Sequence, residues 1–415
     1  MNKPDGEKHG KVFDELEGIF EKLPEVLFNR VKKDLEVMKE IFIESRPARV
    51  LIIGRRGAGK SSLVNALVGE KVAEVGSVVS ETGKASWHTV SNGNGEVEII
   101  DTRGIGDATK PASSEFDSSL EELKAEVEKK CPDVIIFVCK AKEVDAHLSE
   151  DIHAIEKIRS LASKQHAAEI PVMSCVTQVD ELDPRKVNLG VDDCKSEKYI
   201  KKENNVNQAC EVIRKQFDEK SVSLIEVVPV SAYAEYDEDG GVEDSDFWNI
   251  EYLKEKIIDV LPYCAQLQQA RADKLKNMQK RLARKVIHTT AGTCSAIAVT
   301  PIPFADVTPI VALQVAMICG IGKIGGREFS KENAREFLVA MGANVGAGFA
   351  LRESARTIAK YIPGVGSVVS GSVAFFGTKA IGEAAIAYYI DEVSEEVARS
   401  IFNKKKDEER DNEVG

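Results

Sequence analysis

The sequence lacks paired cysteines. Its 415 residues include eight cysteines, but none forms a CxxC pair and none has a histidine nearby at zinc-ligand spacing. Structural zinc sites need clustered cysteine and histidine ligands, and small secreted domains need a framework of disulfides. The pattern therefore argues against both classes and predicts reduced thiols in a cytoplasmic protein.

Positive charge and an apolar leader are also scarce. The 56 Lys and Arg residues stand against 68 Asp and Glu, which gives a net charge of -12. Nucleic-acid binding requires a basic surface that neutralises phosphates, so general binding of this kind is not expected. The first residues form no long apolar run, and Asn2 stands where myristoylation requires glycine, so we expect neither a signal peptide nor a myristoyl anchor there.

The hydrophobic pattern changes twice along the chain. Apolar residues recur at spacings of three and four between 12 and 43, which is typical of an amphipathic helix. Short β-branched runs then alternate with polar segments of helical length, a pattern that favours a parallel sheet with crossover helices. We expect an N-terminal helical segment at 1–46 and an α/β domain at 47–262, with a mostly parallel sheet and helices on both faces. An all-α domain at 263–402 and a disordered tail at 403–415 are expected to follow.

One loop carries the strongest chemical signal. Residues 54–61 read GRRGAGKS between a strand-like run and a helix-like run, and they match G-x-x-x-x-G-K-[ST] in the required context. Glycines let backbone N–H groups converge on phosphates, Lys60 reaches the β and γ phosphates, and the Ser61 hydroxyl ligates Mg²⁺. The expected phosphate-binding residues are Gly54, Arg56, Gly57, Ala58, Gly59, Lys60, Ser61 and Ser62.

Three further motifs follow at the ends of predicted strands. In DTRG, the Asp101 carboxylate is placed to hold Mg²⁺ through water, and the Gly104 amide to contact the γ phosphate. In TQVD, Asp180 can accept two hydrogen bonds from guanine, whereas adenine has no matching donors. In SAY, at 231–233, a backbone N–H can donate to the guanine O6. The set predicts a guanine nucleotide, with Thr177, Gln178, Asp180, Ser231 and Ala232 at the base.

With GRRGAGKSSLVNALVGEK, DTRGIGD, TQVD and SAY, residues 49–262 resemble the translation-factor-type GTPases, closest to the Era-like group. The resemblance implies the P-loop GTPase fold, Mg²⁺-dependent binding and hydrolysis of GTP, and switch segments near 74–90 and 102–118. Thr82 is the first candidate for the switch threonine and Thr89 is the reserve, with an ordinary loop threonine as the alternative for both. The implied metal ligands are Ser61, Thr82 and Asp101.

Three positions depart from the family pattern. Gln178 stands where the family usually has a lysine whose stem packs over the base. Ile105 follows DTRG, where some GTPases carry a glutamine that orients the attacking water. Era-like, dynamin-like and immunity-related GTPases similarly lack that glutamine and often recruit catalysis across a dimer, so a homodimer or oligomer through the GTPase domain is an open interpretation. Gly57 replaces the asparagine of potassium-activated relatives, so potassium activation is not implied.

Two arginines lie inside the phosphate loop. Arg56 is a candidate internal arginine finger, a group that contributes on the order of a thousandfold or more in phosphoryl transfer. The favoured alternative is that Arg55 and Arg56 are an exposed pair that contacts a partner or a neighbouring acid. The candidate catalytic residues are therefore Thr82, Gly104 and Arg56.

The C-terminal region alternates between basic and nearly uncharged segments. A basic stretch at 271–285 precedes an almost uncharged one that ends at 322, and a second quiet segment spans 361–378. With PIPFADVTPIVALQ, GKIGGREFSKENA and YIPGVGSVVSGSVAFFGTKAIGEAAIAYY, residues 285–390 resemble the YcjF-like domain that follows some bacterial Era-type GTPases. The resemblance implies a helical domain, often linked to membranes. Two interpretations stay open: 271–322 and 361–378 contact membrane lipid, or they form the core of a soluble bundle.

Two functions from different classes fit these features. The first is a GTP-hydrolysing switch whose nucleotide state acts on the flanking helices. These helices would pack together, as in the dynamin-like and immunity-related GTPases that the layout resembles. Such a protein could assemble on a membrane. The alternative is a GTP-binding scaffold that hardly hydrolyses, which Ile105 and Gln178 keep open. An ATPase is disfavoured by Asp180 and the SAY turn.

Overall fold

The computed structural model divides into two compact units, Arg46–Asp273 and, separately, Lys274–Gly415 with residues 1–45. The structure describes residues 45–71, 86–91, 96–101, 119–145, 148–237, 240–272, 275–298, 308–327, 331–342 and 371–414, together with single residues between 25 and 40.

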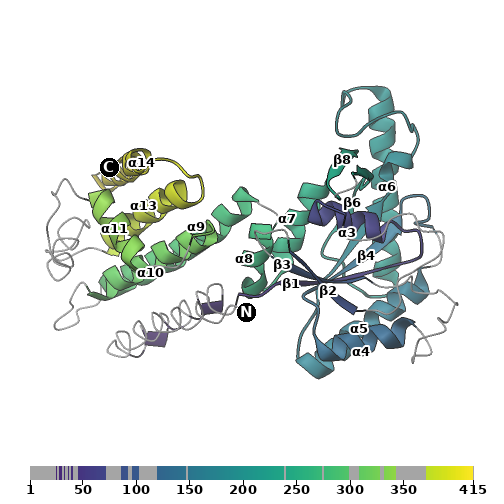
Figure 1. Cartoon of the computed structure of the whole chain (residues 1–415), viewed down its shortest axis with the longest axis horizontal. Helices are drawn as coiled ribbons and strands as arrows, with labels where there is room; N and C mark the ends of the chain where they lie inside the picture. Colours follow the sequence, from purple (N-terminus) through teal and green to yellow (C-terminus); the bar gives the residue numbers. More distant parts are fainter. Residues whose placement is uncertain are drawn as a thin grey trace. The chain divides into compact units, whose positions relative to one another are not determined.

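A six-stranded sheet lies at the centre of the first unit (Figure 1). Its order is β2-β3-β1-β4-β5-β6, and every neighbouring pair is parallel except β2 with β3. The strands are β1 (Ala48–Gly54), β2 (Ser86–Ser91), β3 (Glu96–Asp101), β4 (Val134–Lys140), β5 (Val172–Thr177) and β6 (Val227–Pro229). The prediction of a mostly parallel sheet is confirmed. Long apolar runs such as VLII form central strands because both of their faces are buried.

Helices cover both faces of this sheet. Alternate residues of β1 enter two separate cores: Leu51 packs with residues of α4, α5 and α6, whereas Ile52 packs with residues of α3 and α7. The helices are α3 (Lys60–Val68), α4 (Ser119–Lys129), α5 (Ser149–His166), α6 (Glu197–Glu219), α7 (Ile250–Val260) and α8 (Tyr263–Ala272). A hairpin of β7 (Ala234–Tyr236) and β8 (Val242–Ser245) follows the sheet. Helix α8 packs against β1 and β3, although the helical pattern after Pro262 placed it with the C-terminal helices.

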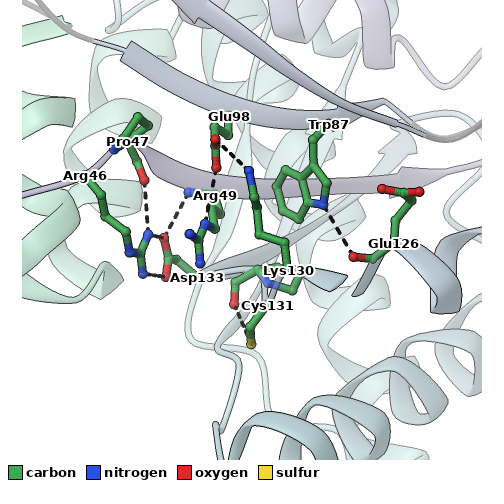
Figure 2. Close-up of polar contacts among 10 residues, drawn as sticks. Arg46, Pro47, Arg49, Trp87, Glu98, Glu126, Lys130, Cys131 and Asp133 are labelled. Atoms are coloured by element: carbon green, nitrogen blue, oxygen red, sulfur yellow. Dashed lines mark hydrogen bonds and ion pairs between the residues drawn. The ribbon is translucent and has the colours of Figure 1, made fainter. Parts of the chain in front are cut away.

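A charged cluster ties the amino ends of β1 and β4 to β3 (Figure 2). Arg46 donates to both carboxylate oxygens of Asp133 at 2.7 Å, and this hydrogen bonding raises the pKa of Arg46. Glu98 accepts from Arg49 Nε at 3.2 Å and from Lys130 Nζ at 2.7 Å. These pairs fix the point where the chain enters the sheet. They lie at the opposite end of the parallel strands from the nucleotide motifs.

The second unit is helical, as predicted. It contains α9 (Lys276–Ala298), α10 (Thr308–Ile324), α11 (Lys331–Gly342), α13 (Gly371–Tyr389) and α14 (Glu395–Val414). Helices α9 and α13 pack so closely that a Cβ at Gly382 would collide with Ile287. In the apolar interior, Gln314 Nε2 donates to Thr378 Oγ1 at 3.0 Å, and both side chains are buried.

Two basic residues of α9 form ion pairs within the helical unit. Lys280 Nζ lies 2.5 Å from Asp391 Oδ1, and Arg284 Nε lies 3.2 Å from Glu383 Oε1. The acids belong to α13 and to the turn after it, so these two basic side chains are paired within the helical unit. Both interpretations of 271–285, contact with lipid headgroups and a place in a soluble bundle, stay predictions.

The almost uncharged segments form helices that pack together. Helices α9 and α10 are in contact, while residues 299–307 and most of 361–378 lie outside the described residues. No helix in the described part of the chain combines the length and apolar character needed to cross a bilayer.

The prediction of a disordered tail at 403–415 is wrong for residues 403–414, because α14 continues to Val414. This segment is rich in Lys and Glu, which are strong helix formers. Mixed charge alone therefore did not distinguish an exposed helix from a disordered tail.

Candidate functional site

The phosphate loop connects the carboxyl end of β1 to α3. Gly57 has φ of 75° and Gly59 has φ of 82°, a left-handed conformation that glycine adopts without a steric penalty. Gly54 lies so close to β4 that a Cβ would collide with the carbonyl oxygen of Val138. The three glycines of the motif are therefore required by the shape of the loop.

Lys60 is a nearly buried cation at the start of α3. Its Nζ donates to the carbonyl oxygens of Gly54 at 2.9 Å and Arg55 at 3.0 Å, so the amine is held against the loop. Ser61 and Ser62 follow in the first turn of the same helix. The start of a helix presents unpaired N–H groups and a partial positive charge, and here a lysine is added to them. The arrangement is suited to bind a polyanion.

Arg55 pairs with a buried acid of α5. Its Nε lies 2.9 Å from Oδ2 of Asp151, whose side chain is 2% exposed. Burial raises the pKa of Asp151, and the charge of Arg55 opposes that shift. For Arg55, the structure thus fits the interpretation of contact with a neighbouring acid. Arg56 is exposed, and its role as an arginine finger stays a prediction.

The TQVD segment at the end of β5 contacts the phosphate loop directly. Thr177 Oγ1 donates to the carbonyl oxygen of Ala58 at 2.7 Å, and Gln178 Nε2 donates to that of Gly57 at 3.3 Å. Gln178 itself is in the left-handed region, with φ of 57°. The sequence motif predicts that both residues lie at the guanine base. Their contact with the phosphate loop was not predicted from the sequence.

Asp180 and Ser231 border one pocket of about 250 Å³. Asp180 is exposed on the 3₁₀ turn Val179–Glu181, and Ser231 pairs through its backbone with Trp248. The Ser231 Oγ is buried and has no hydrogen-bond partner among the described residues. Ala232 is nearly buried beside it. The structure therefore brings together Asp180 and the start of the SAY turn, as the guanine interpretation requires.

Lys202 of α6 lies at the same pocket, and sequence reasoning missed it. Its side chain is fully buried, and its Nζ donates to the carbonyl oxygens of Asp180 at 2.7 Å and Val187 at 2.8 Å. Burial lowers the pKa of Lys202, which the nearby carboxylates of Asp180, Asp183 and Asp192 oppose. The one available signal was its position four residues before Val206, on the apolar face of α6.

The predicted metal and switch residues are placed only in part. Asp101 ends β3 and pairs in parallel register with Ile52 of β1, so its backbone lies at the same edge of the sheet as the phosphate loop. Thr89 is an exposed residue of β2, paired with Glu98 of β3. The remaining predicted residues, Thr82, Gly104 and Ile105, lie outside the described residues.

Comparison with known families assigns two segments of the chain. Residues 49–178 match the family model described as 50S ribosome-binding GTPase, and residues 263–407 match the model described as a domain of unknown function (DUF697). The fold of residues 49–178 is thus that of the P-loop GTPases. The match at 263–407 carries no stated function.

Two curated relatives are similar over part of this domain. GTPase Der of Fusobacterium nucleatum subsp. nucleatum is 30% identical over 131 residues, which are 32% of this chain and 27% of that protein. GTPase Der of Streptococcus sanguinis is 31% identical over 140 residues, 33% of this chain and 28% of that protein. The chain therefore spans less than a third of the length of these relatives.

Solved structures are similar at lower identity. The probable GTP-binding protein engB is 21% identical, with 51% of this chain and 98% of that chain covered and a TM-score of 0.32. Toc33 from Arabidopsis thaliana in complex with Mg²⁺ and GMPPNP is 18% identical, with 62% of this chain and 96% of that chain covered and a TM-score of 0.34.

Proposed function

We propose that this chain is a Mg²⁺-dependent switch protein that binds and hydrolyses GTP and whose nucleotide state acts on its helical region. The observation that carries the proposal is the joining of the phosphate loop to the TQVD segment through Thr177 and Ala58. The family match over 49–178 and the names of the two curated relatives support it.

The phosphate loop binds the phosphates through its amides and Lys60. When GTP enters, Lys60 Nζ exchanges the Gly54 and Arg55 carbonyl oxygens for β and γ phosphate oxygens. The backbone N–H groups at 56–61 donate to the same phosphates, and the helix dipole of α3 favours their charge. The loop is therefore preorganised before the nucleotide arrives.

Hard oxygen ligands for Mg²⁺ are available beside this loop. Ser61 begins α3 directly after Lys60, and Asp101 ends the strand next to β1. Hydroxyl, carboxylate and water oxygens are what Mg²⁺ prefers, so these residues fit the ion. When bound, the metal neutralises charge on the β and γ phosphates. We include Thr82 as a further ligand and Gly104 as an amide donor to the γ phosphate.

The base is read by Asp180 and the SAY turn. The Asp180 carboxylate accepts from guanine N1 and N2, and the Ala232 N–H donates to O6. Adenine offers no donors at those positions, so an adenine nucleotide leaves the carboxylate unpaired. The Gln178 amide is hydrogen-bonded to the phosphate loop and links the base side of the site to it.

Hydrolysis needs a group that this GTPase motif does not itself supply. The side chain of Ile105 has no polar atom with which to orient the attacking water. Arg56 in the phosphate loop is one source of stabilising charge, and a second copy of the chain docked through the GTPase domain is the other. If neither Arg56 nor a second copy of the chain promotes hydrolysis, the chain fits the alternative function, a GTP-binding scaffold.

Phosphate release measured across protein concentrations tests the proposal. We expect release from GTP that requires Mg²⁺ and whose rate per molecule rises with concentration. Lys60→Ala should abolish it, while Lys157→Ala, which alters an exposed lysine of α5, should not change it. GTP binding without release at any concentration supports the scaffold, and absence of GTP binding overturns both functions.

A further inference from the structure

Lys202 is a fully buried lysine in the unit Arg46–Asp273, called the GTPase-domain unit below. It lies on the inner face of α6, one turn before the buried Val206. Lysine is almost never fully buried unless it is paired, because removing an ammonium group from water is costly. A lysine in this position therefore needs a structural reason.

The amine of Lys202 is hydrogen-bonded to backbone carbonyl oxygens of the protein. Lys202 Nζ donates to the Asp180 carbonyl oxygen at 2.7 Å and to the Val187 carbonyl oxygen at 2.8 Å, and the Pro184 carbonyl oxygen is 3.5 Å away. An ammonium group has three donors, and three carbonyl oxygens surround this one. The amine thus ties the turn that carries Asp180 to the loop that follows it.

That turn is tied to the sheet at its first residue, since Val179 is buried and its N–H donates to the Val230 carbonyl oxygen at 3.5 Å. Val179–Glu181 is a 3₁₀ helix of only three residues, and such short helices have poor hydrogen-bond geometry. The pocket of about 250 Å³ borders Asp180, Lys202 and Ser231, so close packing does not fix the turn on that side. On the side of the pocket, the hydrogen bond from Lys202 Nζ holds the Asp180 backbone.

We propose that Lys202 is a positioning residue for base recognition, which holds the backbone of Asp180 so that its carboxylate meets guanine and which thereby sets the preference for GTP over ATP. The inference rests on the proposed function, in which Asp180 reads the base. Lys202 acts through the Asp180 backbone and not by touching the nucleotide. Its amine is already directed at carbonyl oxygens of the protein.

Binding of GTP and ATP to the full chain tests this role. Lys202→Met keeps the apolar stem and removes every donor, and we expect GTP to bind about tenfold or more weakly with ATP affinity unchanged, a loss of about 1.4 kcal/mol in selectivity. Lys202→Gln, which keeps two donors on a shorter side chain, should give an intermediate ratio. Lys201→Met, at the exposed neighbouring position, should match the wild type.

The ratio of the two affinities separates positioning from a general structural role. A purely structural lysine would lower the unfolding midpoint, or weaken both nucleotides equally, and leave the ratio unchanged. A folded Lys202→Met with the wild-type ratio overturns the inference. If Lys202→Met does not fold, Lys202→Gln decides, since a wild-type ratio there overturns the inference as well. A wild-type chain with no preference for GTP instead overturns the proposed function on which the inference rests.

Discussion

Thr177 Oγ1 lies 2.7 Å from the carbonyl oxygen of Ala58, a residue 119 positions earlier in the chain. One hydrogen bond therefore joins the segment that ends β5 to the loop that follows β1. Both atoms are buried. The TQVD segment and the phosphate loop are thus joined at one edge of the sheet.

Removing this hydroxyl should weaken the whole site. Thr177→Val keeps the shape of the side chain but leaves the Ala58 carbonyl without this donor, which we expect to destabilise the GTPase-domain unit by about 1–3 kcal/mol. Nucleotide affinity should fall as well, because the loop loses an anchor. Urea unfolding and nucleotide titration measure the two effects. Ser163→Ala, which removes an exposed hydroxyl, is the control, and an equal response of the two variants would contradict the account.

The Arg46 and Asp133 pair should matter more than an exposed ion pair. The Asp133 side chain is 6% exposed, so Arg46→Met leaves a nearly buried carboxylate with one fewer partner. We expect a loss of about 2–4 kcal/mol in the free energy of unfolding. Lys129→Met breaks the exposed pair with Glu126 and should change stability by less than about 0.5 kcal/mol. Similar losses in denaturant unfolding would show that burial is not the deciding factor.

Two glycines of the helical unit should respond in opposite directions to alanine. Gly382→Ala places a Cβ against Ile287 and should destabilise the unit by about 1–3 kcal/mol. Gly322→Ala in α10 meets only ordinary contacts with Tyr389, beginning at 3.7 Å, so it should stabilise by about 0.5–1 kcal/mol through helix propensity. Thermal unfolding of both variants checks the sign. A stable Gly382→Ala would contradict the close packing of α9 and α13.

Thiol labelling should distinguish the cysteines by burial. Burial raises the pKa of Cys139 to about 12 and that of Cys210 to about 11, so at pH 8 almost none of either thiol is ionised. Cys194 is exposed. We expect a thiol reagent to modify Cys194 first in the native chain and the other two only in denaturant. Mass spectrometry of labelled peptides measures the order, and early labelling of Cys139 would show that this core is open.

Local patterns predicted the sheet and the phosphate loop because their causes are local. Runs of β-branched residues favour buried strands, and Gly57 and Gly59 are needed for a loop conformation set by its own backbone. The contact of Gln178 with Gly57 and that of Lys202 with Asp180 join segments far apart in the sequence, so no motif marks them. The partners of the basic stretch at 271–285 are likewise not marked by any local pattern.

The acids that neutralise α9 lie about a hundred positions away along the chain. Arg284 and Glu383 are 99 positions apart, and they meet only when α13 packs on α9. Composition over 271–285 could therefore describe the charge of this stretch but not its partners. The same applies to Arg55, whose acid Asp151 lies on α5.

Calorimetric titration of the full chain with GTP and with ATP, both in Mg²⁺, tests whether the chain selects guanine over adenine. The account predicts one GTP site per chain and ATP affinity at least about a hundredfold weaker, since adenine leaves the Asp180 carboxylate unpaired. Equal affinities for GTP and ATP, or no binding of either, would contradict it.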